Sequence, residues 1–281
     1  MNGIYWLASY PKSGNTWLRI FMENLFRNTT EPASISDLTV VRYADTVHGL
    51  YEAAGGRSTS EFGDAEIHRL REPVQRFLAS QAETSFVKTH NILARHLGLP
   101  LIYPQYTVGA TYLVRNPFDM VVSYAHHYDM KLDDAIESIC SPYNRVKTSR
   151  QSVFQILGTW SQHVQSWTSS APFKPLVLRY EDLVQRPVRT FEKFVRALGL
   201  PRNPERLRRA VRHSGFATMA AQEREHGFQE RARPDQVFFR SGSVGGWRDV
   251  LTEQQVGRII DAHGDVLIAH RYMSRNGTLR V

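Results

Sequence analysis

Ile4-Tyr5-Trp6-Leu7-Ala8-Ser9 is a short apolar run rich in β-forming residues, and it predicts a buried strand. The turn that follows reads Tyr10-Pro11-Lys12-Ser13-Gly14-Asn15-Thr16-Trp17. Pro11, Gly14 and Asn15 break the strand. Apolar residues then recur at a helical period, at Trp17, Leu18, Phe21, Met22, Leu25 and Phe26. The first 28 residues therefore predict a strand, a tight loop and a helix.

The same alternation of strand and helix continues along the chain. We expect strands at 85–89, 107–114 and 176–180, and helices from Pro117 and over 64–78, 152–167, 188–198, 204–213, 216–225 and 251–268. The rest of residues 29–80 looks irregular and is expected to be a substrate-facing insertion, and 226–246 a long loop. The pattern predicts an α/β fold in a single domain over residues 1–281, with a central parallel sheet flanked by helices.

Composition narrows the class of protein. Hydrophobic residues make up 42% of the 281 residues and charged residues 22%, which is typical of a folded globular chain. The single cysteine, Cys140, excludes an internal disulfide and favours a reducing, cytoplasmic location. Neither a signal peptide nor a membrane span is expected. The net charge of +8 predicts an anionic partner without saying whether it is a nucleotide, a nucleic acid or a membrane surface.

The first turn has the features of an anion site. Backbone N–H groups and the positive end of the following helix would point at the anion, and Gly14 would let the backbone approach it closely. Lys12 adds a cation, and Ser13 and Thr16 add hydroxyl donors. No Walker A pattern occurs in the chain. Taken alone, the turn also fits an ordinary strand-to-helix connection with an N-capping serine.

Two later segments carry comparable chemistry. Arg115-Asn116-Pro117-Phe118-Asp119 ends a predicted strand, and Ser123 lies two turns into the next helix, so that an arginine fork and a hydroxyl could bind a terminal phosphate. The segment Phe238-Phe239-Arg240-Ser241-Gly242 opens a glycine-rich stretch that ends at Trp247-Arg248. Singly, the first would be explained by a surface ion pair and the second by a flexible loop.

Together these segments resemble the PAPS-dependent sulfotransferases of the cytosolic and bacterial types, where PAPS is 3′-phosphoadenosine 5′-phosphosulfate. Residues 9–17 are similar to the family pattern T-Y-P-K-S-G-T-T-W, 115–123 to R-N-P-x-D-x-x-x-S, and 240–248 to R-K-G-x-x-G-x-W-[KR]. Asn15 stands where the family often has threonine, and Ser241 where it has lysine. The resemblance implies a P-loop-like 5′-phosphosulfate loop, PAPS as the co-substrate, and no metal.

The resemblance also implies roles for individual residues. The 5′-phosphosulfate loop would be Lys12, Ser13, Gly14, Asn15, Thr16 and Trp17, with Trp17 also stacking on adenine. The 3′-phosphate would be bound by Arg115, Ser123, Arg240 and Gly242, and the adenine would be bordered by Tyr180, Ser214, Phe216 and Phe238. Phe239 and Ser241 belong to the same nucleotide-covering loop.

A catalytic base is expected in Phe86-Val87-Lys88-Thr89-His90, because a histidine at a strand end can accept a proton near neutral pH. The family has the same K-T-H segment, which implies that His90 deprotonates the acceptor, that Lys88 steadies the sulfuryl oxygens and that Lys12 contacts the bridging oxygen. Without the nucleotide motifs, His90 would be explained as a histidine hydrogen-bonded to backbone.

Two other functions stay open at this stage. A P-loop-like kinase would need a magnesium carboxylate and usually a Walker A lysine, which the sequence does not offer. A non-enzymatic nucleotide- or nucleic-acid-binding protein would explain the basic balance, although arginine-rich stretches such as 202–212 are equally typical of a solvated face. We expect a small-molecule acceptor and no nucleic acid, and nothing in the sequence identifies the acceptor.

Overall fold

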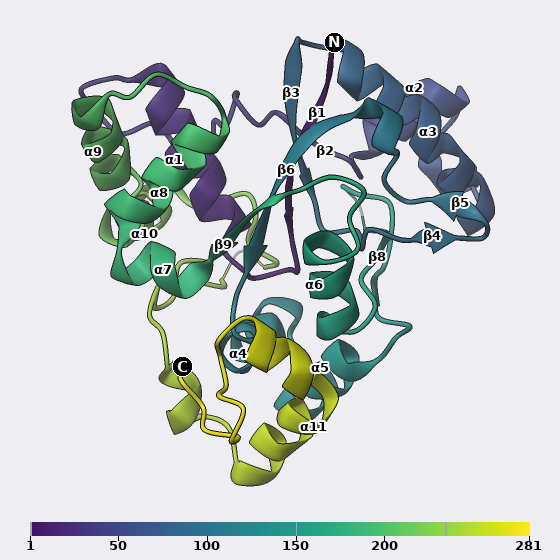
Figure 1. The fold of residues 1–281 in the computed structure, drawn as a ribbon. Coiled ribbons are helices and arrows are strands. Elements are labelled where there is room, and N and C mark those ends of the chain that lie inside the picture. The colour runs from purple at the N-terminus through teal and green to yellow at the C-terminus, as the bar shows by residue number, and fades with distance from the viewer. Residues whose placement is uncertain (1, 150, 234) are drawn as a thin grey trace. The chain divides into compact units, whose positions relative to one another are not determined.

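The computed structural model describes residues 2–149, 151–233 and 235–281 (Figure 1). Within the chain, two compact units can be distinguished. Of the described residues, the sheet unit comprises 2–11, 42–113, 138–149 and 151–177, and the helical unit comprises 12–41, 114–137, 178–233 and 235–281.

A five-stranded sheet with the strand order β2-β3-β1-β6-β9 forms the centre of the sheet unit (Figure 1). Its strands are β1 (Gly3–Ser9), β2 (Tyr43–Ala44), β3 (Thr84–Thr89), β6 (Thr107–Val114) and β9 (Leu176–Arg179). β1 runs parallel to both neighbours, with Trp6 opposite Val87 and Ala110. Trp6, Leu7 and Ala8 are fully buried, as expected for a parallel strand that is covered on both faces. The predicted parallel sheet is confirmed.

Helices and short hairpins complete the sheet unit. They are α2 (His48–Gly55), η1 (Thr59–Glu61), α3 (Asp64–Ser80), β4 (Arg95–His96), β5 (Leu99–Pro100), η2 (Pro104–Tyr106), β7 (Arg145–Val146), β8 (Gln155–Ile156) and α6 (Trp160–Thr168). α3 packs on β1 and β3. α6 packs on β6, because Trp167 stacks on Tyr112 with their ring centroids 6.2 Å apart. Helix α5 (Leu132–Cys140) begins in the helical unit and ends in the sheet unit.

Two expectations about this unit were wrong. Residues 29–80 are not irregular outside the charged helix, because 48–55 form α2 and Tyr43–Ala44 adds an edge strand to β3. The long helix expected over 152–167 starts only at Trp160. Gly158 adopts a left-handed φ of 65°, and Thr159 caps α6 through a capping box with Gln162. The residues before it form strand β8 instead of helix.

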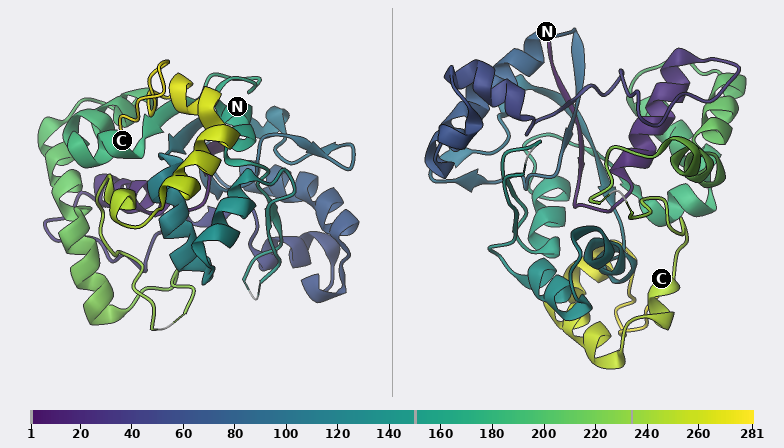
Figure 2. Two further views of the ribbon diagram at one scale, coloured as in Figure 1. Left: turned by 90° about the horizontal axis from the view of Figure 1, so that it is seen from below. Right: turned by 180° about the vertical axis from the view of Figure 1, so that it is seen from behind.

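The helical unit contains α1 (Asn15–Arg27) and several further helices. The others are α4 (Pro117–Tyr128), α7 (Tyr180–Gln185), α8 (Pro187–Ala197), α9 (Pro204–His213), α10 (Phe216–His226), η3 (Gly246–Asp249) and α11 (Glu253–Ala269). The helix boundaries predicted for α8, α9, α10 and α11 hold to within two residues. Phe21 of α1 stacks on Phe191 of α8 with their centroids 3.8 Å apart, and α9 packs beside α1 (Figure 2).

In the described part of the chain, no helix is long and apolar enough to cross a membrane.

Two histidines are buried as neutral rings. His163 of α6 accepts a hydrogen bond from the Tyr112 hydroxyl (2.9 Å) and donates Nε2–H to the carbonyl of His90 (3.0 Å). His263 of α11 is 1% exposed. Burial lowers the pKa of each to about 4, because desolvation penalises the charged ring.

These two histidines should make the fold sensitive to mild acid. The unfolded chain binds their protons near pH 6.5, before the folded chain does, so stability is complete above that pH and is lost as the pH falls toward 4. Between pH 7.5 and 5.5, each should lower the free energy of unfolding by about 1.4 kcal/mol. Urea unfolding at the two pH values measures this. A variant at the exposed His226, His226→Gln, should keep the same loss, and equal stability at both pH values would contradict the assignment.

Candidate functional site

The turn between β1 and α1 has an unusual backbone. Lys12 has a φ of 66° and Gly14 a φ of 98°, so two of three consecutive residues lie in the left-handed region. That region is uncommon for a residue with a side chain, and such residues concentrate at functional sites. Helix α1 starts with Gly14 at its N-cap, which has no side chain to cap the first turn. The positive end of α1 therefore lies at the turn that the sequence predicts to bind an anion.

Arg115 joins this turn to an aromatic group. Its Nη1 donates to the carbonyl oxygen of Lys12 (3.0 Å), and its guanidinium lies 4.2 Å from the ring centroid of Tyr180. The Tyr180 ring meets Trp17 edge to face, with centroids 6.0 Å apart. Four residues to which the resemblance gave a role in nucleotide binding thus lie together in the helical unit.

Several buried polar atoms of this cluster have no hydrogen-bond partner among the described residues. They are the Ser13 hydroxyl, the Arg115 Nε and the Trp17 Nε1. Ser13 is 1% exposed and Arg115 is 9% exposed. Each unsatisfied buried donor costs about 1–3 kcal/mol, so native proteins rarely keep them without a ligand or water. An anion with several oxygens would satisfy Ser13 and Arg115, and the donor set fits a phosphate-bearing group.

The loop at 226–246 is tethered to this cluster by two buried carboxylates. Glu223 of α10 accepts from the backbone N–H of Phe238 (2.7 Å) and of Phe239 (2.8 Å). Asp119 of α4 accepts from Gly245 (2.7 Å) and from Trp247 (3.0 Å) at the other end of the loop. Glu223 was not predicted, since no motif marked it.

The tethered loop places aromatic and cationic groups at the turn. The Lys12 Nζ lies 3.7 Å from the ring centroid of Phe238. Gly242 has a φ of 61°, and a Cβ there would lie 2.3 Å from the Phe216 ring, so no side chain fits. Burial first, and then the positive charges of Arg240 and Lys12, lower the pKa of His126. Arg240 and Lys12 therefore both bring positive charge to the surroundings of His126.

Other residues of the predicted nucleotide site are exposed, half-buried or hydrogen-bonded to other parts of the protein. Arg240 and Ser241 are exposed, and Ser123 is half-buried on α4. The Ser214 hydroxyl donates to the Ala210 carbonyl (2.8 Å) at the end of α9, which is a structural contact. The Thr16 hydroxyl donates to Glu230 (2.8 Å).

His90 lies in the sheet unit, directly after β3. Its Nδ1 is 2.7 Å from the Ser9 carbonyl oxygen and 3.2 Å from the Ser9 hydroxyl. Because a carbonyl oxygen can only accept, Nδ1 carries the proton in the neutral ring and the lone pair lies on Nε2. Ser9 precedes Lys12 by three positions in the sequence. The ring is therefore held in the tautomer that a general base acting through Nε2 needs.

A buried polar network fixes the backbone on which His90 lies. The Asp45 Oδ2 accepts from the Thr89 hydroxyl (3.1 Å) and from the Asn91 amide (2.8 Å). The Asn91 Oδ1 accepts from the Ile156 N–H (3.0 Å), and the Trp167 indole donates to the Asn91 carbonyl (3.0 Å). Sequence reasoning missed Asp45 and Asn91, because they lie 46 positions apart and neither belongs to a motif that it used.

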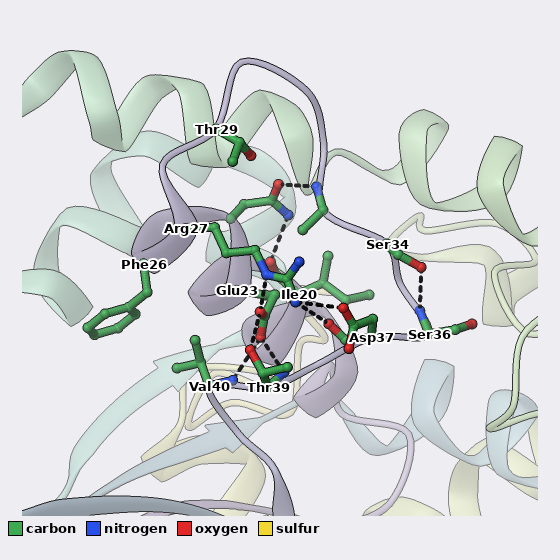
Figure 3. A network of polar contacts seen from close by, with 12 residues as sticks. Ile20, Glu23, Phe26, Arg27, Thr29, Ser34, Ser36, Asp37, Thr39 and Val40 are labelled. Carbon is green, nitrogen blue, oxygen red and sulfur yellow. Dashed lines mark hydrogen bonds and ion pairs between the residues drawn. The ribbon is translucent and has the colours of Figure 1, made fainter.

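The start of the expected substrate-facing insertion is bound to α1 in the helical unit. The buried Glu23 carboxylate accepts from the backbone N–H groups of Thr39 (2.8 Å) and Val40 (2.9 Å), and it pairs with Arg27 (Figure 3). Arg27 in turn pairs with Asp37 (2.7 Å). Residues 33–40 are thus held against α1 by hydrogen bonds and ion pairs with side chains of that helix.

Among residues 2–149, 151–233 and 235–281, no group of three or more His, Cys, Asp or Glu side chains could hold a metal ion.

Thr89→Val tests the network under His90. The change keeps the shape of the side chain but removes the hydroxyl that donates to Asp45 and accepts from the Asn91 N–H (3.0 Å). Leaving that N–H unsatisfied should lower the free energy of unfolding by about 1–3 kcal/mol. Thr84→Val, at the exposed first position of β3, should change it by less than about 0.5 kcal/mol. Equal effects in urea unfolding would show that the network does not hold this segment.

Comparisons with known proteins point to one family. A family model described as "Sulfotransferase domain" matches residues 4–268. Dog sulfotransferase 1B1 is 27% identical over 258 residues, which cover 89% of this chain and 78% of the dog protein. The flavonol 3-sulfotransferase of Flaveria bidentis is 21% identical over 266 residues, covering 90% and 78%.

Two solved structures share the fold. Mouse sulfotransferase SULT7A1 complexed with PAP superposes with a TM-score of 0.62 at 21% identity, covering 94% of this chain and 84% of the mouse chain. Retinol dehydratase in complex with retinol and PAP superposes with a TM-score of 0.65 at 21% identity, covering 99% and 83%.

Proposed function

The chain belongs to the sulfotransferase domain family, and from this membership we propose that it moves a sulfuryl group from PAPS to a hydroxyl of a small molecule, with His90 as the general base. Sulfuryl transfer follows from membership of the family. The role of His90 as the general base and the hydroxyl-bearing acceptor are our proposal. The observation that carries it is the buried pair of unpartnered donors, Ser13 Oγ and Arg115 Nε, beside Lys12 at the head of α1.

The donor nucleotide fits the helical-unit cluster. When bound, PAPS supplies a sulfuryl group on an activated phosphate. We propose that Lys12, Ser13 and the first N–H groups of α1 hold its 5′ end, and that Arg115 binds the 3′-phosphate. Trp17, Tyr180 and Phe238 supply aromatic surfaces for the adenine. The solved relatives were captured with PAP, the product nucleotide, which supports this assignment.

The residues have separate tasks in the transfer. His90 takes the acceptor's proton on Nε2 while the acceptor oxygen forms its bond to sulfur. Lys12 stabilises the charge that develops on the bridging oxygen as the old sulfur–oxygen bond breaks and PAP leaves. We assign Lys88, half-buried on β3, to the sulfuryl oxygens.

The acceptor belongs to the class of small molecules with a nucleophilic hydroxyl or amine. Androsterone and retinol are the compounds bound in the solved retinol dehydratase complexes, and both are apolar molecules with a hydroxyl. A cytoplasmic location is supported by the single Cys140. A bacterial source, expected from the sequence, stays a prediction.

Release of PAP from PAPS tests the function. The protein should release PAP faster when a panel of phenols, sterols and aliphatic alcohols is added, and a sulfated product should appear by mass spectrometry. A protein that binds PAP tightly but transfers nothing to any hydroxyl acceptor in the panel would contradict the proposed activity.

His90→Ala separates catalysis from donor binding. Loss of a general base should lower kcat by about 10²–10⁴-fold. The dissociation constant of PAP should change by less than about threefold, because the donor cluster has its own residues. His226→Ala, at an exposed histidine, is the matched control and should keep full activity. A His90→Ala enzyme with near-normal kcat would exclude His90 as the base.

Gly242→Ala tests the nucleotide-covering loop. The new Cβ would clash with the Phe216 ring and force a side chain into a left-handed backbone, which costs about 1–2 kcal/mol. PAP affinity should therefore fall by about tenfold. Gly246→Ala, where a Cβ meets only the Ser243 hydroxyl at 3.9 Å, should leave affinity unchanged. Calorimetric titration measures the PAP affinity of both variants. Equal affinities would show that this loop does not contribute to the donor site.

A further inference from the structure

The positive charge of the chain is concentrated in one hairpin of helices. Residues 186–213, which include α8 and α9, contain nine arginines and lysines but only two glutamates. This segment therefore carries a net charge of +7 in a chain whose total is +8. A large field of a single sign is unusual on a protein surface unless it faces an anionic partner.

Most of these cations face solvent without an acidic partner. The exposed ones are Arg186, Arg189, Lys193, Arg196, Arg202, Arg208 and Arg212. Among the described residues, the pair of Arg202 with Glu192 (3.4 Å) is the one ion pair in the hairpin. Self-repulsion on this scale weakens the folded state, so an anion that binds here would be favoured.

An apolar cavity lies within the same hairpin. It has a volume of about 220 Å³ and lies where α8, α9 and the end of α1 meet. Its apolar lining includes Leu25, Val188, Val195, Leu200, Pro201 and Leu207. Figure 1 shows α8 and α9 beside α1. No residue of the donor cluster lines this cavity.

The rim of the cavity is cationic, and one cation there is uncompensated. Arg206 donates to the carbonyls of Leu25 (2.6 Å) and Phe26 (3.3 Å), and Arg202 pairs with Glu192. Arg208 lines the cavity, is exposed, and has no ion pair with a described residue. An apolar pocket with one available guanidinium at its mouth matches a ligand that has an apolar body and one anionic end.

We propose that this cavity binds a single-chain anionic amphiphile, with its aliphatic chain among Val188, Val195 and Leu207 and its sulfate or carboxylate head on Arg208. The concave shape favours one inserted chain over a membrane surface. Val188 is the one large hydrophobic residue of the described hairpin that is exposed, which is too little apolar surface for bilayer insertion. The site is separate from the donor and acceptor chemistry proposed above.

Calorimetric titration with octyl sulfate, below its micelle concentration and without nucleotide, tests the site. Each buried methylene contributes a factor of about 4, so hexyl sulfate should bind up to about 15-fold more weakly. Octanol, which has no charge, should bind more weakly than octyl sulfate. Absence of octyl sulfate binding would overturn the proposal, whatever the enzyme does with PAPS.

Matched variants locate the binding. Arg208→Glu should weaken octyl sulfate at least about fivefold, whereas Arg212→Glu, exposed on the same helix but not lining the cavity, should change it less than about twofold. Val188→Trp should weaken it at least about tenfold by filling the cavity, and Val250→Trp, exposed elsewhere, should not. PAP affinity should be normal in all four variants, which shows that they fold.

Two outcomes would overturn this assignment. Equal losses in Arg208→Glu and Arg212→Glu would mean that octyl sulfate responds only to the general field. Strong binding to phosphatidylcholine–phosphatidylglycerol vesicles, reduced alike by both charge reversals and not by Val188→Trp, would identify a membrane-binding face instead.

Discussion

A left-handed backbone at Lys12 and Gly14 is the constraint on which the proposed donor site depends. The chain leaves the buried strand β1 and enters helix α1 within five residues, and these two φ angles make that turn possible. Gly14 adopts this conformation at no steric cost, but at Lys12 it costs about 1–2 kcal/mol. The hydrogen bond from Arg115 to the Lys12 carbonyl helps to hold the strained residue. Arg115 thus has a structural task besides the phosphate contact that we propose.

Buried polar side chains hold the backbone of the segments that carry the candidate site residues. In the helical unit, Glu223 and Asp119 each accept from two backbone N–H groups of the 226–247 segment. In the sheet unit, Asp45 and Asn91 hold the end of β3 just beside His90. Carboxylates that accept several N–H bonds are strong, directional anchors, so loops without regular structure can still present their residues in one arrangement.

The sequence predicted those elements whose signal is local. The strand at 4–9, the strand at 107–114 and the helix at 204–213 follow from a single periodicity, bounded by glycine, proline or a cap, and the structure agrees. The helix predicted over 152–167 fails before Trp160, because there the chain pairs in a short hairpin, β7 with β8, and this pairing overrides the helical pattern. Helix α2 was missed because its eight residues end in glycine and carry only a short apolar pattern.

The same distinction applies to the candidate site. Lys12, Arg115, Tyr180 and Phe238 could be found because each belongs to a motif of recognisable spacing, and the structure brings them together. Glu223 could not be found, since it acts on residues 15 and 16 positions further along the chain through backbone atoms, which leave no trace in the pattern of side chains.

The central claim is that the turn at Lys12 and the Arg115 cluster together recognise a nucleotide with phosphates at both its 3′ and 5′ positions. Titration calorimetry with adenosine 3′,5′-bisphosphate and with ATP, both without magnesium, tests it most directly. The account predicts that the bisphosphate binds at least about tenfold more tightly than ATP, because only the bisphosphate offers a 3′-phosphate to Arg115. Equal affinities, or tighter binding of ATP, would contradict the assignment of the donor site.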